Sequence, residues 1–439
     1  MKFKKIQISQ LSIFIIMLIM VMISSNLNWN KNYQKGILES DARGYYAYLP
    51  AIFIYKDLNF GFFDKIEREK YYNKNLFYDY RLSSNGNVID KYYCGTALAE
   101  LPFFLIAHLS SYLKNFDTDG YSKLYAVFVS IAALFYLAIG LVFLNATLGE
   151  YKINELHKSL TLLAALFGTN LFYYSITEPG MSHVYSFAFI SMFFYYSKKY
   201  FSTYHSVYIF KIAVIAGVIM LIRPVNLMIF LVCPFTAGNF NSFIVGLKSA
   251  LVNVKWFICS CIIFVMVISI QLIIYKLSTG HFFIYSYGGE GFNFSHPHIA
   301  DILFSYKKGL FLYTPMYLLS LTGVFFLWKS SKYEFYSWAG FFILITYILS
   351  SWWMWFYGGS FSSRVYIEYI PVFMVLLALT FKETNNMKFL KVTYLTLVLL
   401  LIVVCQIQTY QYRYYQIHWS EMTKEKYWDV FLRVDKLIK

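Results

Sequence analysis

Long apolar runs separated by short polar gaps dominate the pattern along this chain. Eleven runs are apolar enough to be membrane-spanning helices, because a hydrocarbon core of roughly 30 Å needs about 20 apolar residues, and fewer where flanking Tyr and Lys reach the interface. The pattern therefore predicts an all-α fold, a polytopic transmembrane helical bundle of about 11 spans. The runs lie at 9–25, 124–146, 159–177, 183–200, 206–222, 225–237, 252–275, 310–328, 333–351, 366–381 and 392–408.

Two of these runs, 206–222 and 225–237, are weak and flank Arg223-Pro224. As one continuous helix from 206 to 237 they would be about 48 Å long at a rise of 1.5 Å per residue, which is too long for a single crossing. We therefore expect a hairpin or a re-entrant pair of helices that is interrupted at Arg223-Pro224.

A twelfth apolar segment, 94–113, carries Glu100, Pro102 and His108, and its placement decides the topology. If it lies on the surface, the lysines between the spans collect on the cytoplasmic side, as the positive-inside rule requires. If it crossed the bilayer, every lysine pair after residue 113 would face outward. We therefore expect an amphipathic helix in the outer interface. The lysines concerned are Lys2, Lys4, Lys5, Lys152, Lys158, Lys198, Lys199, Lys248, Lys255, Lys329, Lys332, Lys382, Lys388 and Lys391.

This topology predicts a multi-pass protein of the inner or plasma membrane with a cytoplasmic N-terminus. The expected membrane domain is 1–408, in which 27–122 forms an outer loop with interfacial helices, and 409–439 is a short aromatic extracytoplasmic tail. The first apolar run reaches about Ser25 without a convincing small-residue cleavage site, so we expect an uncleaved helix rather than a signal peptide.

The amino-acid composition limits the class of protein and the partners that the chain could bind. Hydrophobic residues make up 59% of the chain and charged residues 14%, which excludes an ordinary soluble domain. The formal charge of +15 would suit nucleic acid, but the basic residues mostly lie in the gaps that membrane topology explains, so nucleic acid is not an expected partner. Four of the five cysteines fall in apolar segments and show no metal-ligand spacing.

The first predicted outer loop has the densest polar chemistry, in the stretch 39–50. Asp41 could act as a general base, since a carboxylate near a low-dielectric surface can have a raised pKa, and Glu39 is the second choice. Arg43 could hold Asp41 or meet an anionic substrate, but a simple surface ion pair is the favoured explanation for Arg43. A solvated loop without function is the alternative for the whole stretch.

Two further polar sites interrupt the apolar pattern on the predicted outer face. Glu178 and His183 flank a Pro-Gly turn and could bind a divalent cation or the acceptor, or could simply belong to a connector. Arg223 is an ionisable residue at membrane depth, and its fork of donors suits a phosphate. Snorkelling of Arg223 to the interface is the competing explanation.

The late loops add cations and aromatics. Lys307 and Lys308 break the lysine bias, and two outer cations suit a phosphate-linked substrate or anionic lipid. The loop 276–309, with glycines around a glutamate, could close over a lipid head group. The segment from Trp352 to Arg364 contains Gly-Gly-Ser-Phe-Ser-Ser-Arg, in which backbone approach at the glycines and the Arg364 cation would suit a sugar or phosphate. Interfacial Trp and Tyr are expected there in any case.

These motifs resemble the C-type superfamily of membrane glycosyltransferases, which includes protein O-mannosyltransferases and lipid A aminoarabinose transferases. The resemblance spans nearly the whole hydrophobic chain and rests on the acidic first loop (Glu39, Asp41), the 95–102 helix, the turn at Glu178 and the motif ending at Arg364. It implies transfer of a sugar from a polyprenyl-phosphate carrier to an extracytoplasmic acceptor, with Asp41 as the base. Many members have two adjacent acids where this chain has Glu39-Ser40-Asp41, and several carry a soluble C-terminal domain in place of the short tail expected here.

The sequence therefore predicts a membrane hexosyl- or pentosyltransferase that acts in cell-envelope glycan synthesis. Its expected partners are a polyprenyl-phosphate sugar donor, a glycan, lipid or protein acceptor, and membrane lipid, and a divalent metal ion is an open alternative at Glu178 and His183. A lipid-linked sugar transporter or flippase is the rival class, but it would show paired broken helices, and only Arg223-Pro224 is a strong break. A polysaccharide polymerase or ligase shares the same outer chemistry and stays open.

Overall fold

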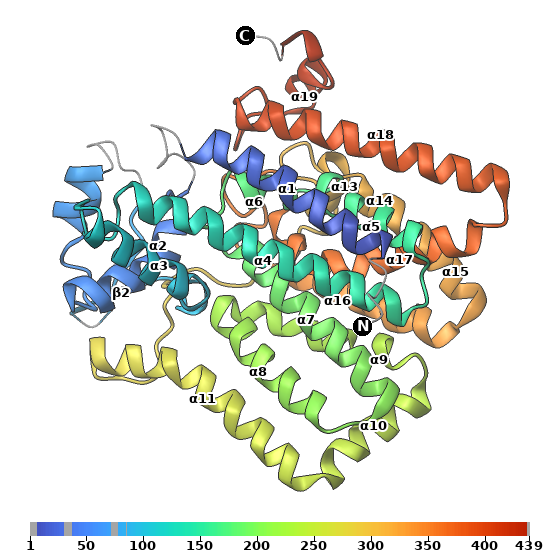
Figure 1. The fold of residues 1–439 in the computed structure, drawn as a ribbon, viewed down its shortest axis with the longest axis horizontal. Helices are drawn as coiled ribbons and strands as arrows, with labels where there is room; N and C mark the ends of the chain where they lie inside the picture. The colour runs from blue at the N-terminus through green and yellow to red at the C-terminus, as the bar shows by residue number, and fades with distance from the viewer. Residues whose placement is uncertain (1–6, 30–36, 72–77, 85, 437–439) are drawn as a thin grey trace, which may run out of the picture.

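The computed structural model describes residues 7–29, 37–71, 78–84 and 86–436, and in this part of the chain it is a bundle of helices with one small β-hairpin (Figure 1). The hairpin is antiparallel and pairs Arg81 with Asp90. It lies in the first outer loop, for which the sequence predicted interfacial helices but no strands. The elements up to the middle of the chain are α1 (Ile8–Asn28), α2 (Asp41–Pro50), the π-helical segments η1 (Ala51–Tyr55) and η2 (Phe63–Tyr71), β1 (Arg81–Ser84), β2 (Asn87–Asp90), α3 (Gly95–Leu113), α4 (Lys123–Glu150), α5 (Glu155–Phe167), α6 (Leu171–Ile176) and α7 (Ser182–Thr203).

The second half of the chain continues the helical pattern. Its elements are α8 (Val207–Ile222), the 3-10 helix η3 (Pro224–Val232), α9 (Cys233–Ala237), α10 (Phe240–Val252), α11 (Val254–Thr279), α12 (Ile299–Phe304), α13 (Leu310–Tyr313), α14 (Met316–Ser320), α15 (Thr322–Ser330), α16 (Lys332–Ser350), the 3-10 helix η4 (Arg364–Tyr369), α17 (Ile370–Thr384), α18 (Lys388–Arg413), α19 (Lys424–Val430) and η5 (Val434–Lys436).

Six helices of the described residues are long and apolar enough to cross a membrane: α1, α3, α4, α11, the continuous η4–α17 and α18. An all-α membrane protein is therefore confirmed in its coarse form. The number of about 11 spans stays a prediction, since several predicted spans consist of two or three short helices rather than one.

The breaks within predicted spans have local causes. The break predicted at Arg223-Pro224 is present: α8 ends at Ile222, and Arg223 is extended (φ −154°, ψ 111°) because a residue before proline is disfavoured in the helical region. The predicted run 310–328 is instead divided into α13, α14 and α15, and Pro315 stands before α14. The run 159–177 is likewise divided into α5 and α6 around Gly168.

The helices give the bundle two chemically different ends. At the lysine end, where α1 begins and α4 ends, contacts join turns that carry the predicted cytoplasmic lysines. Lys199 pairs with Glu150 at 2.7 Å, Lys382 donates to the Tyr151 carbonyl, and Lys198 donates to the Thr236 carbonyl. The lysine pairs thus belong to one physical face, as the topology prediction requires.

At the opposite end, here called the Asp41 end, α1 ends and α4 begins, and Figure 1 shows α2, α3 and β2 there. The helix α3 runs across this end. Its start at Gly95 packs on the last residues of α8, Glu100 accepts a 2.8 Å bond from Tyr185 in the first turn of α7, and His108 lies 2.6 Å from Tyr125 in the first turn of α4. Both ends of α3 therefore contact the same end of the bundle, and the interfacial placement of this helix stays a prediction, since its length and composition also suit a membrane span.

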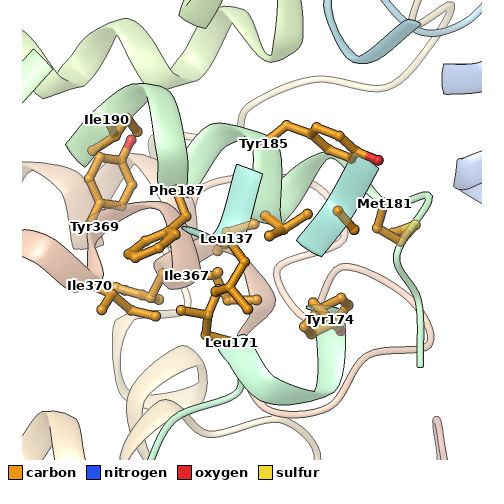
Figure 2. Close-up of a cluster of buried hydrophobic side chains, with 14 of the residues drawn as sticks. Leu137, Leu171, Tyr174, Met181, Tyr185, Phe187, Ile190, Ile367, Tyr369 and Ile370 are labelled. Atoms are coloured by element: carbon orange, nitrogen blue, oxygen red, sulfur yellow. The ribbon is translucent and has the colours of Figure 1, made fainter. Parts of the chain in front are cut away.

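A close-packed apolar core lies beneath the Asp41 end. Figure 2 shows Leu137 of α4, Leu171 of α6 and Phe187 of α7 packed with Ile367 of η4 and Ile370 of α17, and all five are buried. The core therefore fixes η4 against three other helices. The tail is also attached: α18 runs past residue 408 to Arg413, and α19 folds back on it.

Candidate active site at the Asp41 end

An ion pair between Asp41 and Arg364 is the centre of the candidate site. Arg364 Nη2 donates to Asp41 Oδ2 at 2.7 Å, and the side chains are 12% and 19% exposed respectively. Asp41 is the first residue of α2, where a helix N-terminus favours a carboxylate. Arg364 is the first residue of η4, which the core holds in place.

Tyr92 holds the other oxygen of Asp41. Its hydroxyl donates to Asp41 Oδ1 at 2.7 Å, and Tyr78 contacts Tyr92 through a hydroxyl-hydroxyl hydrogen bond. Burial favours the neutral form of Asp41, but the charge of Arg364 and the bonds from Tyr92 and Arg364 outweigh it and lower the pKa of Asp41. The expectation of a raised pKa at Asp41 is therefore wrong in direction: two close donors stabilise the carboxylate.

Glu178 and Lys308 lie within electrostatic range of this pair. Burial raises the pKa of Glu178 to about 7 against the opposing charge of Arg364, and Tyr173 donates to Glu178 at 2.9 Å. Burial also lowers the pKa of Lys308 to about 7, and repulsion by Arg364 acts in the same direction. Both groups therefore change charge near neutral pH, close to the central ion pair.

Lys307 and Lys308 were predicted as two adjacent cations of one phosphate site, but they point to different surroundings. Lys308 is 2% exposed; its ammonium donates to the Ser360 carbonyl and lies 4.9 Å from the centre of the Tyr412 ring. Lys307 lies over the ring of Phe356, 3.5 Å from its centre. Both lysines thus contact the segment from Trp352 to Arg364, but only Lys308 is buried.

A second ion-pair group involves Arg223, Glu368 and His183. Arg223 donates to Glu368 Oε1 at 3.0 Å, and His183 Nδ1 lies 2.9 Å from the same oxygen. Arg223 is 15% exposed, whereas Glu368 and His183 are buried. Arg364 and Glu368 both belong to η4, so this short helix carries a cation that pairs with α2 and an anion that pairs with the residue after α8.

Arg43 does not form the predicted surface ion pair, and it is directed away from Asp41. It donates to Glu67 Oε2 at 2.7 and 3.0 Å in a position where both side chains are buried. Tyr80 and Tyr121 donate to the other oxygen of Glu67. The partner explains the error: Glu67 lies 24 residues away in the loop, and burial of both charges makes this pair a structural link between α2 and η2.

The remaining predicted residues have different surroundings. Glu39 is exposed, and its charge acts on Glu178. Glu178 and His183, the predicted metal pair, have different hydrogen-bond partners, Tyr173 and Glu368. Among the described residues no group of three or more His, Cys, Asp or Glu side chains could hold a metal ion.

The loop between α11 and α12 is tied to the same end of the bundle. Glu290 forms a 2.6 Å ion pair with Lys91, the residue before Tyr92. The backbone of this loop also bonds to the segment after α16, through Trp353 N to the Gly291 carbonyl at 2.9 Å. The predicted flexible loop is thus attached beside Asp41.

Sequence reasoning missed Glu368, Tyr92 and Lys91. Glu368 had the signal that identified Arg223, an ionisable residue in an apolar run, and it stands four residues after Arg364. Tyr92 had no comparable signal, because the chain contains 42 tyrosines and spacing alone does not distinguish one of them.

Comparison with known proteins shows similarity in fold. No protein-family model matches the sequence, and no curated protein matches it. The archaeal oligosaccharyltransferase AglB from Archaeoglobus fulgidus, in complex with an inhibitory peptide and a dolichol-phosphate, is structurally similar with a TM-score of 0.50 at 11% identity, over 96% of this chain and 57% of that chain. A complex of the Archaeoglobus fulgidus oligosaccharyltransferase with Zn and sulfate gives a TM-score of 0.46 at 12% identity, over 95% and 54%.

At 11% identity, the similarity to AglB concerns the fold alone. The chain spans little more than half the length of these two proteins.

Proposed function

We propose that this protein is a membrane glycosyltransferase that transfers a sugar from a polyprenyl-phosphate-linked donor to an extracytoplasmic acceptor, with Asp41 as the base. The observation that carries the proposal is the Asp41–Arg364 ion pair at one end of a bundle whose fold is similar to that of AglB. AglB was solved with a dolichol-phosphate and a peptide, and this supports a lipid-linked donor and a separate acceptor here.

Asp41 acts on the acceptor. Its lowered pKa keeps it as a carboxylate at neutral pH, so it can accept a hydrogen bond from an acceptor O–H or N–H and orient the attacking atom. A carboxylate of low pKa is a weak base, so the acceptor proton moves to Asp41 late, after the bond from the anomeric carbon to the phosphate oxygen has largely broken. The new bond then forms between the acceptor atom and the anomeric carbon.

The cations act on the leaving group. The bonding electron pair departs with the lipid phosphate, and its negative charge must be met as the bond breaks. Arg364 pairs with Asp41 and lies close enough to Lys308 to act on its charge. Arg364 and Lys308 therefore place positive charge beside the base. Arg223 is a third cation, partly exposed and held by its ion pair with Glu368 of η4. Glu39 stays a proposed second acid.

The experiment is a transfer assay in membranes that contain the protein, with radiolabelled polyprenyl-phosphate sugars and endogenous acceptors. Asp41→Asn should lower the rate at least about a hundredfold, the usual contribution of a general base. Glu69→Gln is the matched control, because Glu69 is an exposed acid of the same loop. Normal transfer by Asp41→Asn at equal protein level would remove Asp41 from the mechanism. Carrier movement across vesicles without labelling from any donor would favour a transporter.

A further inference from the structure

We propose that Tyr92 is a positioning residue that fixes the orientation of the Asp41 carboxylate, and that Tyr78 strengthens this contact by donating a hydrogen bond to the Tyr92 hydroxyl. The inference rests on the proposed function, in which Asp41 is the base, and it assigns a role to two tyrosines of the first outer loop. The geometry that carries it is a chain of three polar groups, in which the Asp41 carboxylate, the Tyr92 hydroxyl and the Tyr78 hydroxyl are joined by hydrogen bonds.

The direction of this chain follows from the chemistry of its ends. An ionised carboxylate only accepts hydrogen bonds, so the Tyr92 hydroxyl must donate its single proton to Asp41. The oxygen of Tyr92 can then only accept from Tyr78, and Tyr78 must be the donor. A hydroxyl that accepts a hydrogen bond becomes a stronger donor, so donation by Tyr78 strengthens the bond from Tyr92 to Asp41 Oδ1.

The surroundings hold the whole Tyr92 residue, as a positioning role requires. Its ring lies directly on the backbone of α2, where a Cβ at Gly44 would be 2.4 Å from Tyr92 Cδ2, so only glycine fits there. The Tyr92 carbonyl accepts a 2.7 Å bond from Tyr48, and its N–H donates to Asp90 at 2.8 Å. With the ring and both backbone groups fixed, the hydroxyl oxygen is held within hydrogen-bond distance of Asp41 and Tyr78.

The contacts around α2 also hold Tyr78 in place. Arg43, held by the buried pair with Glu67, donates from Nη1 to the Tyr78 carbonyl at 3.3 Å. The structural link between α2 and η2 thus also supports the outer end of the hydrogen-bond chain. The sequence stretch around Asp41 contributes three parts to one arrangement: the carboxylate, Arg43, and the glycine on which Tyr92 lies.

Asp41 is therefore held at both oxygens, by Tyr92 at Oδ1 and by Arg364 at Oδ2. The plane of the carboxylate is fixed by these two bonds, and one remaining lone pair on each oxygen is presented in a constant direction to an acceptor. Arg364 alone would leave the carboxylate free to rotate about its last bond. Further charged or titratable groups that act on Asp41 are Lys91 after β2, Tyr174 of α6, Glu178 between α6 and α7, Tyr45 of α2, and Tyr287 of the loop after α11.

The test compares Tyr92→Phe, Tyr78→Phe and Tyr93→Phe in the same transfer assay, with the pH dependence of kcat measured for each. Tyr92→Phe keeps the ring on Gly44 and removes only the donor. We expect kcat to fall about tenfold and the acidic limb of its pH profile to move up by about one pH unit, since a hydrogen bond to the ionised form is lost. Tyr78→Phe should give a smaller shift in the same direction. Tyr93→Phe, the adjacent tyrosine, should leave both quantities unchanged.

The quantity compared is the shift of the acidic limb between variant and wild type. Its absolute position is not used, because Glu178 also titrates near neutral pH in the wild type and in each variant. Tyr92→Phe with wild-type kcat and an unmoved acidic limb, in a protein that loses activity with Asp41→Asn, overturns the inference and leaves the proposed function standing. Absence of transfer by the wild type contradicts the proposed function itself. If Tyr92→Phe does not accumulate in membranes, Tyr78→Phe decides, and an unmoved limb in that variant overturns the inference.

Discussion

Replacing Arg364 by Gln tests the central ion pair most directly. Arg364 Nη2 lies 2.7 Å from Asp41 Oδ2, and both side chains are largely buried. An opposite charge at this distance lowers a carboxyl pKa by about 1–3 units, and each unit corresponds to about 1.4 kcal/mol. Without Arg364 the burial of Asp41 is no longer outweighed, so its pKa should rise by about 1–3 units, to above the ordinary value.

Two measurable effects follow for catalysis. The acidic limb of the kcat profile should move up by about 1–3 pH units, because Asp41 must lose its proton at a higher pH before it can act as a base. In addition, kcat on the alkaline plateau should fall by about 10²–10³, the usual loss when a donor to developing negative charge is removed. Arg364→Lys keeps the charge without the planar fork and should be intermediate.

Stability should respond with a definite sign. In the wild type the folded-state pKa of Asp41 is lowered, so the pair stabilises the fold above the ordinary carboxyl pKa, and this stabilisation is lost as pH falls through the folded value. In Arg364→Gln the folded pKa lies above the unfolded one, and Asp41 instead destabilises the protein at neutral pH.

The assay is the polyprenyl-phosphate sugar transfer from about pH 3 to pH 9, because the lowered pKa of Asp41 places the wild-type acidic limb below the ordinary carboxyl range, with thermal unfolding in detergent at matched pH values. Arg433→Gln is the control, because Arg433 pairs with Asp435 on the exposed tail. A kcat profile in Arg364→Gln that coincides with the wild type in position and height would refute the reasoning.

Three further changes have specific expected results. Arg43→Met leaves Glu67 buried without its cation and should cost about 3–5 kcal/mol, seen as faster tryptic cleavage of the first outer loop, while Arg43→Met with Glu67→Gln should recover part of this loss. Gly95→Ala would place a Cβ 2.2 Å from the Ile222 nitrogen, so α3 and the end of α8 must move apart. This movement should cost about 1–3 kcal/mol of folding free energy, measured as a lower unfolding temperature. Lys308 loses its proton near pH 7, so polyprenyl-phosphate binding should weaken from pH 6 to pH 8, and Lys308→Met should remove most of this dependence in a binding titration.

The sequence allowed the helical class and the two-ended arrangement to be predicted, because both follow from the thickness of a bilayer and the cost of placing lysine on its outer side. The internal breaks were less accessible. The run 159–177 divides at Gly168-Thr169-Asn170 and the run 310–328 first divides at Thr314-Pro315, and these two breaks are too short to interrupt the hydropathy of the apolar residues on either side.

For the candidate site, the sequence identified single residues but not their pairing. Asp41 was singled out by the polar density of the first outer loop and Arg223 by the cost of an ionisable group at membrane depth. Glu178 and Arg364 were singled out by the glycine-containing motifs beside them. Which of them meet depends on how α2, α8 and η4 pack, and periodicity contains no information on that. Arg43 was misassigned for the same reason, since its buried partner in η2 is separated by a segment without a clear pattern.

The separation of Asp41 and Arg364 along the chain has a consequence for biogenesis. The two residues are 323 positions apart, and at about 5–20 residues per second the ribosome needs about 16–65 s to make the second after the first. During that interval the carboxylate lacks Arg364, its ion-pair partner, so burial of Asp41 would be strongly unfavourable. Membrane insertion of the first helices and formation of the Asp41–Arg364 pair must therefore be separate events, and a nascent chain that stops before η4 would be inserted without this pair.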